Sequence, residues 1–134
     1  MKKVLVNAIQ ILLEDNVENL TSKNAAYDQN FYGKTNLWCT YTDSGNTYTI
    51  DSADEFEHDH VTFAIYATND GDIDTTSESL LINFTASNLS VTGYNTIEIT
   101  KTMTRGPIKE PRADGFQYWH VDIEYRIVTS KNRS

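Results

Sequence analysis

The sequence has a single cysteine, Cys39, among its 134 residues. One cysteine cannot form an intrachain disulfide, and it provides no spaced set of thiolate ligands for a metal. Prolines and glycines are also scarce, at two and six, which excludes collagen-like and low-complexity chains. Stability must therefore come from an ordinary hydrophobic core, and we expect one domain over residues 1–134.

Long apolar runs are missing as well. The first apolar stretch follows Lys2 and Lys3, but Asn7 and Gln10 interrupt it and no small-residue cleavage pattern follows. It is also shorter than the ~20 apolar residues that span a bilayer. We therefore expect a folded helix in an intracellular protein.

Basic residues are outnumbered, with 11 Lys and Arg against 19 Asp and Glu and a net charge of −8. Such a chain repels phosphate backbones, and it offers no basic amphipathic helix to anionic lipid. A dedicated nucleic-acid reader and a lipid-surface binder are therefore disfavoured. Other proteins remain the expected class of partner.

The apolar pattern predicts two helices. Residues 3–15 place their apolar side chains at the helical period, as one stripe. Thr75 and Glu78 have the spacing of a capping box and predict a second helix that ends near Ser87 and Asn88. Residues 21–36 between the first helix and the first strand are polar, and we expect a long connection there.

Strand-forming residues fill most of the remaining chain. Residues 37–42 and 48–50 predict a hairpin whose turn is residues 43–46, and residues 61–66 predict a third strand. Residues 96–104 alternate apolar and polar side chains, with Ile97, Ile99 and Met103 on one face. The final strand shows the longest alternation, with Trp119, Val121, Ile123, Tyr125 and Ile127 on one face. A short polar tail, residues 129–134, follows.

The predicted fold is therefore α+β, in the order α-β-β-β-α-β-β. A mostly antiparallel sheet of about five strands would pack its apolar face against the two helices.

Residues 51–60 form the sharpest cluster of chemical groups, and we expect a solvated or interface loop there. His58 and His60 would share a face in an extended segment, which makes them weak candidates for a metal site. A third ligand at a defined spacing is missing, so we predict no metal and no cofactor. The acidic residues Asp54, Glu55 and Glu57 are instead candidates for contacting a partner.

A locally basic segment, residues 105–115, joins the last two predicted strands. Arg105, Lys109 and Arg112 make it a candidate projecting hairpin that would meet an acidic patch on a neighbouring subunit. Carboxylates such as Glu98, Asp122 and Glu124 fall on predicted polar strand faces, where solvated residues are expected. With no nucleophile motif or phosphate-binding loop in the sequence, we predict that the protein is not an enzyme.

The chain resembles the tail terminator (tail-completion) proteins of long-tailed bacteriophages, and more loosely the minor capsid and head–tail joining proteins. The resemblance covers nearly the whole chain. It consists of the helix with Val4, Leu5, Ala8, Ile9, Leu12 and Leu13, the hairpin, the strand of residues 61–67, the helix after Asp72, and the closing strands that end with residues 115–127. The helix after Asp72 is poorer in Ala, Glu and Lys than in the family, and residues 51–60 are more acidic.

This resemblance implies a structural subunit of the virion, assembled in the host cytoplasm. Copies would form a ring, commonly a hexamer, that caps the tail tube and joins it to head-connector proteins. DNA would cross the lumen without sequence-specific binding, which an acidic protein suits. Two other functions stay open: a small-molecule or lipid-binding α+β module, and a metal-dependent hydrolase that uses His58 and His60.

Overall fold

The structure is a computed structural model that describes residues 1–27, 36–51, 54–111 and 117–132, with the side chains of residues 46–51, 54–55 and 110–111 outside the description. The elements follow in the order α1 (Lys3–Asn16), β1 (Ala25–Ala26), β2 (Leu37–Asp51), β3 (Asp54–Ala67), α2 (Asp70–Asn83), β4 (Tyr94–Pro111) and β5 (Gln117–Lys131). The predicted α+β class and element order are confirmed. No helix in the described ranges is both long and apolar enough to cross a membrane.

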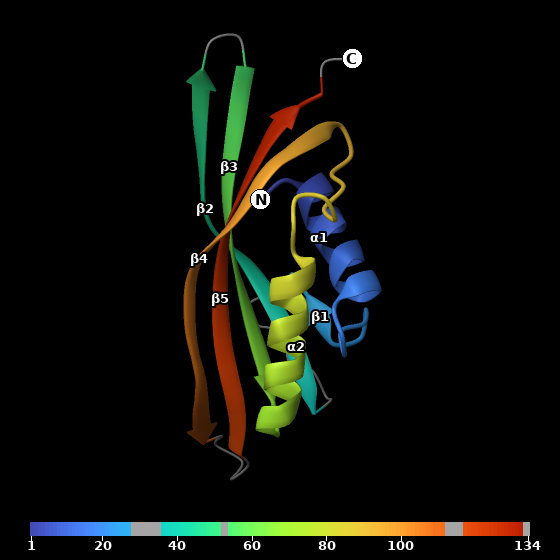
Figure 1. Cartoon of the computed structure of the whole chain (residues 1–134), viewed down its shortest axis with the longest axis vertical. Coiled ribbons are helices and arrows are strands. Elements are labelled where there is room, and N and C mark those ends of the chain that lie inside the picture. Colours follow the sequence, from blue (N-terminus) through green and yellow to red (C-terminus); the bar gives the residue numbers. More distant parts are fainter. Residues whose placement is uncertain (28–35, 52–53, 112–116, 133–134) are drawn as a thin grey trace.

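The strands form one sheet in the order β1-β2-β3-β5-β4, antiparallel except for the short β1–β2 pair. Both helices lie on the same face, which we call the helix side; the opposite face, on which no described helix lies, is the open face (Figure 1). The sheet is strongly twisted. The β2–β3 hairpin extends beyond the helices at one end of the sheet, and the β4–β5 hairpin ends at the other (Figure 1).

The hairpin predicted for residues 37–50 is wrong, because this segment is the single strand β2. Its pairing with β3 slips by one residue between Asp43 and Gly45, where the Gly45 N–H donates to Asp43 Oδ1 at 2.9 Å. Such a β-bulge uses the same Asp, Gly and Asn chemistry as a turn, which explains the misreading. Three strands still lie between the two helices, as predicted, because the short strand β1 takes the place of the missing one. It lies in the segment of residues 21–36 that was predicted to be a connection.

Helix α1 agrees with its prediction to within one residue, and its apolar stripe is buried as expected. Helix α2 begins earlier than predicted, because Asn69 and not Thr75 caps it: Asn69 Oδ1 accepts from the Asp72 N–H at 2.7 Å. The helix also ends at Asn83, before the predicted end. Asp70 and Asp72 occupy its first turn, where the helix dipole favours negative charge.

The hydrophobic core fills the space between the helices and the sheet. Strand β5 contributes Val121, Ile123, Tyr125 and Ile127 to it, which confirms the alternation predicted for this strand. Aromatic rings pack at its centre, with the ring centroids of Phe63 and Phe84 5.0 Å apart and those of Phe84 and Tyr125 4.8 Å apart. Strand β5 continues to Lys131 and Thr129 is fully buried, so the strand extends into the segment predicted as a polar tail.

Candidate functional site

The first half of β3 contains the acidic segment that was predicted to be a loop. That prediction is wrong, because residues 54–60 are strand: they pair with β2 throughout and with β5 from Phe56 onwards. The Lys2 Nζ lies 2.8 Å from Glu57 Oε2 and 3.4 Å from Asp59 Oδ2, and it donates to Thr129 Oγ1 at 3.2 Å. Asp59 is fully buried, so Lys2 supplies the opposite charge that a buried carboxylate needs. Glu57, a candidate interface residue, is thus engaged within its own subunit.

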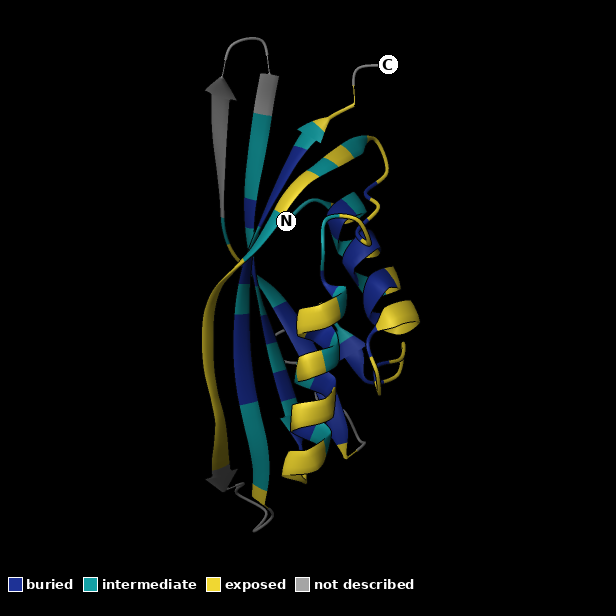
Figure 2. Ribbon diagram, viewed as in Figure 1, coloured by how far each residue is buried: buried dark blue, intermediate teal, exposed yellow. Residues whose placement is uncertain are grey.

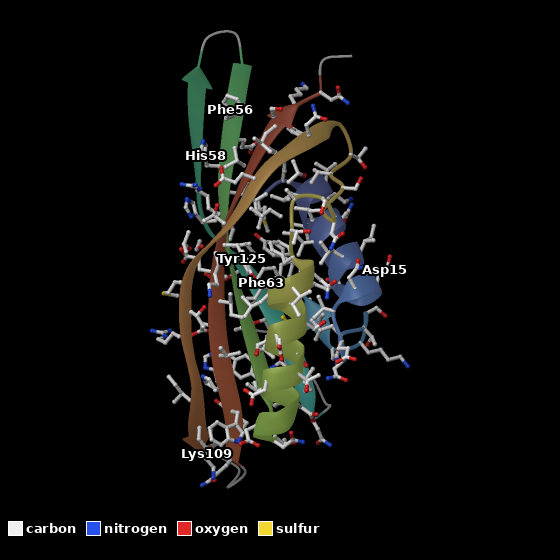
Figure 3. The ribbon with its side chains drawn as sticks, viewed as in Figure 1. Asp15, Phe56, His58, Phe63, Lys109 and Tyr125 are labelled. Carbon is white, nitrogen blue, oxygen red and sulfur yellow. The ribbon has the colours of Figure 1, made fainter. Side chains whose placement is uncertain are left out.

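His58 and His60 alternate with these carboxylates and therefore share the open face, as the sequence predicts for an extended segment. Figure 3 places His58 and Phe56 on the β2–β3 hairpin, far from Lys109 at the other end of the sheet. His60 lies opposite Arg126 on β5. In the described part of the chain, no three His, Cys, Asp or Glu side chains gather in a way that could hold a metal.

The middle of the open face carries rows of polar side chains across β3, β5 and β4. Glu124 accepts from Thr102 Oγ1 at 2.9 Å, and Glu98 accepts from Thr100 Oγ1 at 2.6 Å. Asp122 accepts from Arg105 Nη2 at 2.9 Å and from His120 Nε2 at 2.7 Å. The three carboxylates that the sequence placed on polar strand faces are thus held in hydrogen bonds within the sheet.

Asp122 is the most buried of these carboxylates. Burial alone would raise its pKa, but the hydrogen bonds from His120 and Arg105 and the charges of both partners outweigh that effect, so the pKa lies below its ordinary value. The carboxylate is consequently ionised at neutral pH. It orients Arg105, whose side chain remains 68% exposed.

An aromatic row crosses the open face near the end of β3, where no sequence pattern predicts one. The rings of Trp38 and Tyr66 stack with centroids 5.0 Å apart, and Tyr66 and His120 stack at 4.4 Å. These residues are cross-strand neighbours in register on β2, β3 and β5. The pairing of strands that are distant in sequence creates this row, so the only signal for it was the aromatic content of each strand.

Strand β4 is an edge of the sheet and is exposed along most of its length (Figure 2). Its pairing with β5 shifts at three places, so the alternation predicted for residues 96–104 does not hold. Ile97 and Met103, predicted to share a face with Ile99, are 50% and 40% exposed. Bulges of this kind twist an edge strand and discourage uncontrolled pairing with other chains.

The basic residues of β4 are accessible on this edge. Lys101, Arg105 and Lys109 are all exposed, and the Lys109 Nζ lies 5.8 Å from the ring centroid of Trp119. Of the other candidate interface residues, Arg112 lies outside the described residues, and Asp54 and Glu55 are part of β3 with side chains outside the description. The structure therefore brings Arg105 and Lys109 onto one edge and separates them from the acidic hairpin.

Helix α2 presents an acidic outer surface that the sequence analysis did not select. Asp70, Asp74 and Glu78 are exposed at four-residue spacing, next to the exposed Leu81 and Ile82. A surface depression of about 270 Å³ lies between α2 and the residues after α1, and it is lined by Glu18, Thr75, Glu78, Ser79, Ile82 and Asn83. Its two carboxylates and one apolar wall suit the head and the aliphatic stem of a lysine or arginine.

Cys39 is fully buried in the core, and burial raises the pKa of its thiol to about 12. A thiol in this state is protonated at neutral pH and is a poor nucleophile. Cys39 is therefore not an activated nucleophile.

One chain in the solved structure of the virion of a native gene transfer agent (GTA) particle has a similar fold. The superposition covers 96% of this chain and 86% of that chain, with a TM-score of 0.62 and 5% sequence identity. No protein-family model matches the sequence, and no curated protein does. At this identity the likeness establishes a shared fold.

Proposed function

We propose that the protein is a structural subunit of a phage-like virion, and specifically a tail terminator. In this role its copies form a ring, most simply a hexamer, that caps the tail tube and binds head-connector proteins. The subunits assemble in the host cytoplasm and remain in the virion. DNA passes through the lumen without sequence-specific binding.

The observation that carries this proposal is the fold likeness to a virion chain over almost the full length of both proteins. Insertions and missing elements are therefore few, despite the very low sequence identity. The resemblance of the sequence to tail terminators points to the same class of particle and rests on residues distributed through the whole chain. Neither observation concerns a catalytic group.

The shape of the subunit also supports an assembly role. The two hairpins end at opposite ends of the sheet, so one subunit offers contacts both above and below its core (Figure 1). A ring that joins a tube to a connector needs two such ends. It also needs two different patches at the sides, because a cyclic interface beyond a dimer is heterologous.

The test is assembly of the purified chain, alone and with the tail-tube protein of the same virion. Light scattering after gel filtration should give a mass several times the 15.2 kDa of one chain, six times for a hexamer. Negative-stain images should show rings, and these should bind at one end of tail-tube polymers. A mass of one chain at high concentration, with no rings on tubes, would refute the proposal. Co-purification of a small molecule with a monomer would favour a ligand-binding module instead.

A further inference from the structure

We infer that the ring interface joins the basic edge of one subunit, defined by Lys101 and Lys109 on β4, to the acidic surface of α2 on the next copy. This inference rests on the proposed function and identifies the contact by which copies associate. The occupant of the α2 surface is thus a second copy of this chain.

Charge complementarity is the first argument. Strand β4 carries three exposed cations, and neither Lys101 nor Lys109 has a carboxylate partner among the described residues. Helix α2 contains four carboxylates and no basic residue. The acidic β2–β3 hairpin is a weaker match for β4, because Glu57 and Asp59 already form ion pairs with Lys2 inside the subunit.

The second argument is that the two patches lie at similar positions along the strand direction of the sheet. Lys109 pairs with Trp119, which pairs with Ala67 at the end of β3, and α2 begins three residues later at Asp70. The basic edge and the start of α2 therefore lie at the same end of the sheet (Figure 1). Neighbours in a cyclic ring are related by rotation without a rise, so patches that meet must lie at equal heights along the axis. With the strands standing along the ring axis, these two patches meet that condition.

The surface depression beside α2 could bind a basic side chain of the neighbouring copy. Glu18 and Glu78 line it together with Ile82, whose side chain is 66% exposed. An inserted lysine or arginine would cover that apolar surface with its stem and place its charge between the two carboxylates. Burial of Ile82 would also remove the most exposed large apolar side chain among the described residues.

The experiment exchanges the charges. The basic-edge variant is Lys101→Glu with Lys109→Glu, the helix variant is Asp74→Lys with Glu78→Lys, and the swap variant combines all four changes. The matched control is Lys3→Glu with Lys131→Glu, two exposed lysines away from both patches; it has the same net charge as the basic-edge variant. Circular dichroism and thermal unfolding establish that each variant is folded.

Each two-residue variant should raise the apparent dissociation constant of the ring by at least about tenfold, because it sets like charges against each other. The swap variant should restore assembly to near the wild-type level, and the control should leave it unchanged. If the wild type forms rings and the basic-edge variant forms them equally well, the inferred interface is refuted and the proposed function stands. If the wild type forms no rings, the proposed function itself fails.

Two further outcomes would overturn the interface. The first is loss of assembly in both two-residue variants without recovery in the swap variant, which would show that the patches do not contact each other. The second is unchanged assembly of the basic-edge variant together with loss of binding to a short double-stranded DNA. The β4 edge would then be a DNA contact.

Discussion

The ionic cluster around Lys2 allows a sharp test of how the β2–β3 hairpin is held to the body of the subunit. The perturbation is Lys2→Met, which keeps an unbranched apolar stem and removes the ammonium group. It removes the ammonium group that contacts both Glu57 and the fully buried Asp59. The adjacent Lys3→Met is the matched control, because Lys3 is the exposed first residue of α1, directly after Lys2.

Removing one partner of a buried ion pair costs about 3–5 kcal/mol, because a charge stays buried and uncompensated. Here the side chains of Lys2 and Glu57 are still 16% and 12% exposed. Water can therefore solvate part of the charge that the substitution leaves behind, which lowers the cost. We expect the free energy of unfolding to fall by about 2–3 kcal/mol, which lowers the Tm by roughly 8–10 °C for a domain of this size. Lys3→Met should change it by less than about 0.5 kcal/mol.

Urea unfolding followed by circular dichroism at fixed protein concentration measures both variants. The double variant Lys2→Met with Asp59→Leu removes the buried carboxylate as well, and it should recover at least half of the lost stability. Equal stabilities of Lys2→Met and Lys3→Met would refute the reasoning. So would a double variant less stable than Lys2→Met alone.

Three further predictions concern Asp122, Cys39 and the core. The lowered pKa of Asp122 means that its stabilising effect is present above its unfolded-state pKa and is lost as the pH falls through the folded-state pKa. Asp122→Asn should therefore cost about 1–2 kcal/mol at pH 7, and this difference should shrink in urea titrations as the pH falls through that lowered pKa. Labelling of Cys39 by an aromatic disulfide reagent should require unfolding, so fast labelling of the folded protein at pH 8 would contradict its burial and its pKa of about 12. Phe63→Ala should destabilise the fold by about 3–5 kcal/mol in urea unfolding, whereas Leu81→Ala, at a side chain 40% exposed, should cost less than about 1 kcal/mol.

The sequence predicted the fold class and the element order because the strongest periodic patterns belong to elements with one buried face. The alternation in β5 and the stripe of α1 are set by local spacing, and both reappear as buried faces. The errors occurred where local chemistry was ambiguous. Asp43 and Gly45 suit a turn and a bulge equally well, and Asn69 competes with Thr75 as a helix cap.

The acidic segment of β3 was unpredictable for a different reason. A buried carboxylate in a strand is acceptable only when a counter-charge is present, and Lys2 lies 57 residues from Asp59 in the chain. No local pattern reveals such a partner, so the charged run was read as a solvated loop. The aromatic row of Trp38, Tyr66 and His120 was missed for the same reason, since its members come from three strands.

The net charge of −8 is not spread evenly over the described surface, because some carboxylates have basic partners inside the subunit and others do not. Four described carboxylates on the sheet have a basic side chain as partner inside the subunit: Glu57 and Asp59 have Lys2, Asp122 has Arg105, and Glu98 has Arg126. On α2, by contrast, Asp70, Asp74 and Glu78 have no side-chain partner among the described residues. Helix α2 therefore carries a group of uncompensated carboxylates, and the exposed Lys101 and Lys109 lie on one sheet edge. A charge placed only to repel DNA could be spread over any surface facing the lumen, whereas two localised patches of opposite sign favour a directional contact between copies.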